Sequence, residues 1–110
     1  MIDWDRVAEL RAEVGEDDFA EVVLLFLEEA DDVAHRLEHI TKPDAAQIAR
    51  DLHSLKGAAL NLGFAELAGH CQDGERRARG GDAAIDLKII ARSYHDSKAS
   101  FQRALTQSAA

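Results

Sequence analysis

Hydrophobic residues recur every three or four positions along most of the chain, which is the spacing of amphipathic helices. The pattern is interrupted at Gly15, at residues 41–44 (TKPD), at Gly63 and at residues 79–82 (RGGD). These interruptions separate one short helix and four longer ones, and no alternating strand pattern competes. Because short connections favour antiparallel neighbours, we predict an all-α, antiparallel up-down-up-down four-helix bundle with a short additional N-terminal helix.

The first two predicted helices cover residues 3–14 and residues 17–40. The first places four apolar residues on one side, namely Trp4, Val7, Leu10 and Val14. In the second, steps of three and four alternate as in a bundle seam, through Phe19, Val23, Phe26, Ala30, Val33, Leu37 and Ile40. Leu24 and Leu27 lie beside this seam, and we expect them to cover the short first helix.

The third predicted helix follows Pro43, with Asp44 as its N-cap, and ends near Leu62, where Gly63 can adopt the left-handed conformation of a C-cap. The fourth covers residues 65–79 and should bury Leu67, Ala68, Cys71 and Ala78. The last covers residues 83–107, with Leu87, Ile90, Tyr94, Phe101 and Leu105 facing inward. The arginines at 76, 77 and 79 are expected to form a solvated helix end, and acidic pairs such as Asp31–Asp32 to lie on a polar face.

Length and charge narrow the class of protein. A chain of 110 residues is long enough for one core, so we expect a single domain spanning residues 1–110. The net charge of −8 argues against nucleic-acid binding, and the apolar run at residues 22–27 is too short to cross a bilayer. A lone cysteine and no secretory signal suit a cytoplasmic protein. We expect a monomer without a membrane partner. The bundle is complete from its methionine, which favours a free-standing protein over a module of a larger kinase, although both remain open.

His53 lies on the third predicted helix but not on its apolar face. At about 100° per residue, it projects roughly 130° from the centre of the face formed by Ile48, Leu52 and Leu55. The imidazole should therefore be in water. An isolated exposed histidine usually has no function, and that interpretation applies to His35, His39, His70 and His95.

The neighbours of His53 change this interpretation. Gly57 follows one helical turn later, and a mid-helix glycine costs roughly 1 kcal/mol relative to alanine, which a surface position has no packing reason to accept. Without a Cβ there, another molecule can approach the ring. Arg50 and Lys56 place positive charge nearby, which favours the neutral imidazole and would partly neutralise a bound anion. A neutral, accessible histidine flanked by cations is suited to accept a phosphoryl group.

The segment HSLKGAALNLG (53–63) resembles the signature of histidine-containing phosphotransfer (HPt) domains, helical bundles that relay phosphoryl groups in two-component signalling. Residues 14–40 are similar to the first long helix of that family, and residues 64–82 to the segment after the signature. Serine often follows the glycine in the family, whereas this chain has Ala58 and Ala59. The chain has neither the ATP-binding motifs nor the HELRTP-like motif of bacterial histidine kinases.

The resemblance implies that His53 is phosphorylated, that Lys56 is the neighbouring cation and that Gly57 permits access. The phosphoryl group would pass reversibly between His53 and aspartates of response-regulator receiver domains, including that of a hybrid histidine kinase. No cofactor is expected on this chain, because the receiver would hold the Mg²⁺. No autokinase activity is expected, and whether such a phosphocarrier counts as an enzyme is left open. The expected docking surface consists of Ala46, Ala49, Arg50, Leu60 and Phe64 around His53.

Two alternatives remain. A purely interacting HPt-like bundle would bind a partner without carrying phosphate, although it would not need a nucleophile. A metal-binding bundle would use His35 and His39, which are spaced i, i+4, with Asp32 nearby. The second alternative lacks the Glu-x-x-His pairs of di-iron bundles.

Overall fold

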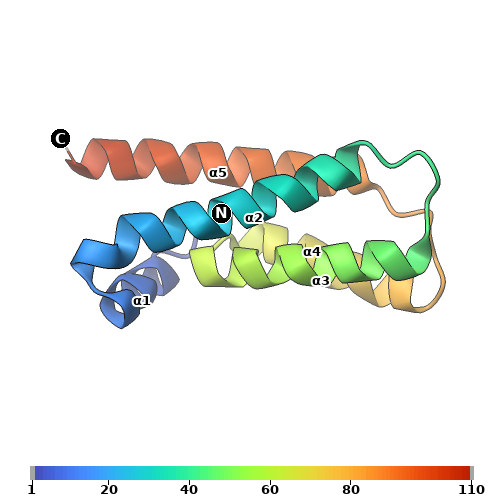
Figure 1. Ribbon diagram of the computed structural model, residues 1–110, viewed down its shortest axis with the longest axis horizontal. Coiled ribbons are helices and arrows are strands. Elements are labelled where there is room, and N and C mark those ends of the chain that lie inside the picture. The colour runs from blue at the N-terminus through green and yellow to red at the C-terminus, as the bar shows by residue number, and fades with distance from the viewer. Residues whose placement is uncertain (1, 110) are drawn as a thin grey trace.

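The computed structural model describes residues 2–109, with side chains as far as residue 107, and contains five helices in that range (Figure 1). They are α1 (Trp4–Val14), α2 (Glu16–Glu38), α3 (Ala45–Leu62), α4 (Ala65–Arg79) and α5 (Leu87–Ala109). Consecutive helices from α2 to α5 run antiparallel in a bundle of 45 × 21 × 20 Å. The predicted all-α bundle with an extra N-terminal helix is confirmed. None of the described helices combines the length and apolar character needed to cross a membrane.

Capping side chains set where the helices begin. The Asp3 carboxylate accepts hydrogen bonds from the Asp5 and Arg6 amides, and Asp44 accepts one from Ala46, so both aspartates are N-caps. The last helix begins at Leu87 and not at residue 83 as predicted. The reason is Asp86, whose carboxylate accepts a hydrogen bond from the Ile89 amide at 3.2 Å and so provides an N-terminal cap at this point. The second helix, α2, ends at Glu38, two residues before its predicted end at residue 40.

Gly63 joins α3 to the start of the chain. Its φ of +77° is left-handed, as predicted, and its carbonyl accepts a hydrogen bond from the Asp3 amide at 2.7 Å. A Cβ at this position would lie 2.6 Å from the Asp3 carbonyl oxygen, so glycine is required for two reasons. Ile2 forms an isolated antiparallel bridge with Phe64. The N-terminal segment is thereby fixed across the turn between α3 and α4.

Most residues predicted to face inward are buried, but several lie differently. Trp4 is 45% exposed, although its ring stacks on Phe101 with centroids 5.9 Å apart. Five others are only partly buried, namely Val14, Phe26, Ile40, Leu87 and Leu105. The prediction that Leu24 covers α1 is wrong, because Leu24 is 54% exposed, whereas Leu27 is 4% exposed. Arg11 of α1 lies over Phe19 of α2, with its guanidinium carbon 4.4 Å from the ring centroid.

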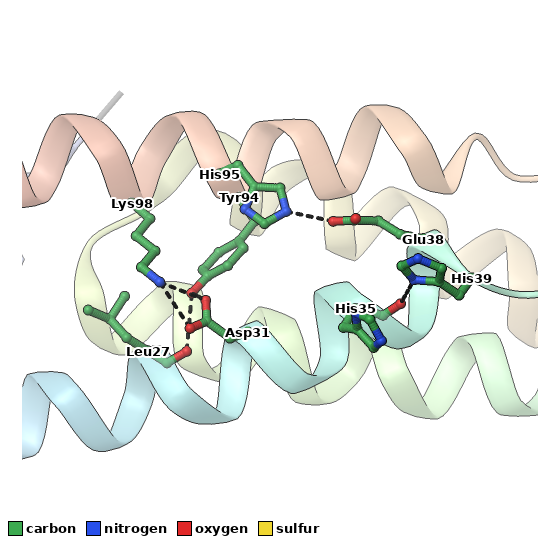
Figure 2. Close-up of polar contacts among 8 residues, drawn as sticks. All are labelled: Leu27, Asp31, His35, Glu38, His39, Tyr94, His95 and Lys98. Carbon is green, nitrogen blue, oxygen red and sulfur yellow. Dashed lines mark hydrogen bonds and ion pairs between the residues drawn. The ribbon is translucent and has the colours of Figure 1, made fainter.

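Polar side chains join α2 to α5 (Figure 2). The Tyr94 hydroxyl lies 2.5 Å from one carboxylate oxygen of Asp31, and Lys98 Nζ lies 3.0 and 2.9 Å from the two oxygens. His95 directly follows Tyr94 on α5, and its Nε2 lies 2.5 Å from Glu38, which is two helical turns after Asp31 on α2. Burial and the neighbouring Asp31 carboxylate raise the pKa of Tyr94. Asp31 lies on a polar face of α2 with 42% of its side chain exposed, as predicted, but it is also part of the contact between two helices, which was not predicted.

Candidate functional site

His53 lies midway along α3 with 63% of its side chain exposed, as its position on the helix predicts. Its Nδ1 lies 3.0 Å from Oε2 of Glu75 on α4. An ionised carboxylate can only accept a hydrogen bond, so Nδ1 carries the hydrogen in this contact. In the neutral ring the lone pair is then on Nε2, the nitrogen farther from the backbone. The contact with α4 orients the ring and leaves its nucleophilic nitrogen unoccupied by Glu75.

Glu75 is buried, with 5% of its side chain exposed, and it touches three charged or polar side chains. Oε1 lies 2.8 Å from Lys56 Nζ, and Oε2 lies 2.5 Å from the Arg79 guanidinium as well as near His53. Burial acts to raise the pKa of Glu75, but hydrogen bonds from Lys56 and His53 and the charges of Lys56 and Arg79 outweigh it, so the pKa is lowered. Glu75 is a carboxylate at neutral pH.

A buried glycine allows this contact between α3 and α4. Gly74 lies directly before Glu75 on α4, and Leu52 lies directly before His53 on α3. A Cβ on Gly74 would lie 2.7 Å from Leu52 Cδ1 and 3.3 Å from Ile90 Cδ1. Glycine at 74 therefore lets the two helices approach more closely than a larger residue would. The close approach brings the Glu75 carboxylate within hydrogen-bonding distance of the His53 ring.

The surface around His53 is open. A Cβ on Gly57 would have no atom of the protein within 4 Å, so the glycine serves no packing purpose within the described chain. Ala46 and Arg50 are exposed, and Leu60 is 56% exposed. At the edge facing α2, the Ser54 hydroxyl donates a hydrogen bond to Glu29 at 3.2 Å. The structure thus identifies Glu29 as an α2 residue bordering the site, which sequence reasoning could not name.

Three expectations for this surface need correction. Phe64 is fully buried, with its ring centroid 5.5 Å from that of Phe101, so it cannot contact a partner. Ala49 is 8% exposed, because it lies two turns before Lys56 on the edge of α3 that meets α4. Arg50 donates to Gln47 at 2.8 Å, and the second cation in contact with Glu75 is Arg79 from α4. The arginine cluster at the end of α4 is therefore not purely a solvated helix end.

Sequence reasoning missed both Glu75 and Arg79. A signal was present for Glu75, because it lies four residues after Cys71 and three before Ala78, on the apolar stripe of α4. A carboxylate on a buried stripe requires partners. Which side chains supply them depends on how α4 packs against α3, and no local pattern contains that information.

The candidate metal ligands His35 and His39, and the single cysteine, Cys71, have simpler surroundings than His53. The rings of His35 and His39 have centroids 4.3 Å apart, and His39 Nδ1 lies 2.8 Å from the His35 carbonyl oxygen (Figure 2). Within residues 2–109, no group of three His, Cys, Asp or Glu side chains is placed to hold a metal ion. The metal-binding alternative thus gains no support. Cys71 is a buried free thiol, and burial raises its pKa to about 12.

Comparison with known protein families agrees with this geometry. The family model of the Hpt domain matches residues 21–110, which leaves α1 outside the matched region. Searches among curated proteins and among solved structures found no match. The family model spans the four helices of the bundle, including His53 and Glu75. The chain therefore belongs to the Hpt domain family, whose members act in histidine phosphotransfer within phosphorelays.

Proposed function

We propose that this chain is a phosphorelay intermediate that accepts a phosphoryl group on His53 from a receiver-domain aspartate and passes it reversibly to another receiver domain. The observation that carries this proposal is the orientation of the ring: Glu75 holds Nδ1, and 63% of the side chain is exposed beside the open backbone of Gly57. Hpt domains interact with receiver domains and kinases, which supports a hybrid histidine kinase and a response regulator as the partners.

The transfer step requires a lone pair and stabilisation of charge more than covalent machinery. The lone pair on His53 Nε2 forms the N–P bond while the P–O bond to the receiver aspartate breaks, and the bonding electrons remain on the departing carboxylate. The imidazole gains positive charge as the bond forms. Glu75 stabilises this charge through the hydrogen bond from Nδ1, which keeps its hydrogen throughout. The reverse transfer follows the same path.

The docking surface we propose is centred on His53 and Gly57 and includes Ala46, Arg50 and Leu60. Leu60, at 56% exposed, is an apolar residue available for contact. Arg50 and Lys56 give this surface local positive charge on a chain whose net charge is −8. That local charge suits the acidic pocket of a receiver domain, which would hold Mg²⁺ to neutralise the phosphoryl oxygens.

The decisive experiment is transfer from radiolabelled, phosphorylated receiver domains to the purified chain. We expect acid-labile, base-stable label on the wild type and on His95→Gln, and no label on His53→Gln. His95→Gln is the matched control because its side chain is 55% exposed and also contacts a carboxylate. Label that survives His53→Gln would overturn the proposal. Receiver binding without any transfer would instead favour the purely interacting bundle.

A further inference from the structure

The Glu75 carboxylate, which orients the His53 ring, also favours protonation of that ring. A negative charge beside an imidazole favours the protonated ring, which has no lone pair with which to attack phosphorus. Glu75 Oε2 lies 3.0 Å from Nδ1, which is within hydrogen-bonding distance. A site that uses Glu75 for orientation therefore needs a second feature that prevents the carboxylate from holding the ring in its protonated form.

We propose that Arg79 is a positioning residue that keeps His53 neutral by neutralising the same Glu75 oxygen that holds Nδ1. The guanidinium lies 2.5 Å from Oε2, whereas Lys56 lies 2.8 Å from the other oxygen, Oε1. The inference rests on the proposed role of His53 as phosphoryl acceptor. It assigns to Arg79 an effect on the protonation of the ring, exerted through Glu75.

The balance of charge supports this role. With a neutral His53 the cluster holds one negative charge, on Glu75, and two positive charges, on Lys56 and Arg79. Protonation of the ring would add a third positive charge among partners that lie within hydrogen-bonding distance of one carboxylate. Without Arg79, Lys56 alone would compensate Glu75, and a protonated ring would cost less free energy.

The other charged or titratable groups around the ring are already engaged or uncharged. On α3, Arg50 donates to Gln47. From α2, Glu29 accepts a hydrogen bond from Ser54, and Arg36 pairs with the buried Asp51 at 3.1 Å. On α4, Cys71 is uncharged near neutral pH because burial raises its pKa to about 12. Arg79 is therefore the cation of α4 whose removal should change the charge felt by Nδ1.

The position of Arg79 separates its effect from that of Lys56. Arg79 reaches Glu75 from one turn further along α4, on the Nδ1 side of the ring, and 64% of its side chain is exposed. Phosphoryl transfer takes place at Nε2. Loss of Arg79 should therefore change how much of the ring is neutral at a given pH, and should change the reaction of the neutral ring much less.

The test uses a donor that needs no partner protein. Phosphoramidate transfers its phosphoryl group to a histidine nitrogen as its P–N bond breaks, and its nitrogen, protonated before the bond breaks, leaves as ammonia with the bonding electrons. We would measure the rate of His53 phosphorylation from about pH 5 to pH 9 for the wild type, Arg79→Gln, Arg79→Lys and Arg76→Gln. Arg76→Gln is the matched control, because Arg76 pairs with Asp73 at 3.3 Å on the exposed side of the same helix.

For Arg79→Gln we expect the acid limb of the pH–rate profile to move upward by about half a pH unit to one unit, with a similar rate on the alkaline plateau. Arg79→Lys should restore most of the wild-type profile, and Arg76→Gln should not change it. The NMR signals of the His53 ring should show the same displacement in pH without any phosphoryl donor. Circular dichroism would establish that each variant is folded.

An unchanged acid limb in Arg79→Gln, or a lowered plateau with no displacement, would overturn the inference. The ring signals make this result independent of the relay itself. If receiver domains fail to phosphorylate the wild type, the proposed function fails, while the NMR titration still decides whether Arg79 controls the protonation of His53.

Discussion

Two segments of the chain have nearly the same local pattern and very different surroundings. Residues 53–58 read HSLKGA and residues 95–100 read HDSKAS, so each has a histidine, a lysine three positions later and a small residue after the lysine. The two histidines are also similarly exposed, at 63% for His53 and 55% for His95. Neither spacing nor exposure distinguishes them.

The carboxylates opposite the two segments do distinguish them. On α4, the single carboxylate of Glu75 contacts both His53 and Lys56. On α2, Glu38 contacts His95 and Asp31 contacts Lys98, so the second pair is divided between two carboxylates (Figure 2). The nitrogen differs too: Glu75 holds Nδ1 of His53, whereas Glu38 holds Nε2 of His95. In the neutral rings, Glu75 therefore leaves the lone pair of His53 on the outer nitrogen, Nε2, whereas Glu38 leaves that of His95 on Nδ1, next to the backbone.

Burial of the carboxylate adds a second difference. Only 5% of the Glu75 side chain is exposed, compared with 34% for Glu38 and 42% for Asp31. A buried side chain surrounded by packed atoms has little freedom to change its direction. Glu75 can therefore define the orientation of an exposed ring, while the α2 carboxylates chiefly join α2 to α5.

Removing each carboxylate gives the largest expected effect. Glu75→Ala should lower the rate of phosphoryl transfer to His53 by about tenfold or more, because the ring loses both its orientation and the partner for its developing positive charge. The matched variant Glu38→Ala should leave the rate unchanged. Initial rates of labelling by a phosphorylated receiver would measure both. Equal rates in the two variants would show that the buried carboxylate is not what distinguishes the two histidines.

Substituting the small residue after each lysine, Gly57 or Ala99, gives a smaller effect. For Gly57→Ala we expect higher stability but slower transfer. A Cβ on Gly57 meets no atom within 4 Å, so Gly57→Ala should raise the free energy of unfolding by about 1 kcal/mol. The same methyl group should slow transfer from a receiver several-fold while leaving phosphorylation by phosphoramidate unaffected. Ala99→Gly, at the corresponding position after His95, should lower stability by about 1 kcal/mol and leave transfer unchanged.

Urea denaturation and parallel transfer assays would measure these changes. If Gly57→Ala slowed the small donor as much as the receiver, the glycine would be acting on the ring itself, and not on the approach of a partner protein.

The smallest expected effect concerns acid stability, to which both polar regions contribute. Burial acts to raise the pKa of Glu75 and of Asp31, but hydrogen bonds and neighbouring cations lower both below their usual values of 4.5 and 3.8. A lowered pKa in the folded state means that the stabilisation is complete above the unfolded value and is lost as the pH falls through the folded value.

The free energy of unfolding should therefore decrease as the pH falls below about 5. Urea titrations from about pH 3 to pH 6 would measure it. Glu75→Gln and Asp31→Asn should each flatten this dependence. A steep acid dependence that persists in both variants would assign it to other carboxylates.

The sequence alone was sufficient for the features that depend on local geometry. Apolar periodicity predicted the helices, Asp44 and Gly63 marked the two ends of α3, and the position of His53 on the helix predicted an exposed ring. These predictions succeed because caps and helix faces depend on residues within a turn or two of each other. The start of α5 was predicted at residue 83 and not at Leu87, because Asp86 was not recognised as the capping residue.

The tertiary structure decided everything that depends on the approach of one helix to another. It placed Glu75 and Arg79 beside His53, buried Ala49 and Phe64, and left Leu24 exposed. These outcomes depend on how closely the helices pack, and the missing side chain of Gly74 contributes to this at α3 and α4. Contacts between residues far apart in the chain follow from packing, and packing is not contained in the pattern of any single segment.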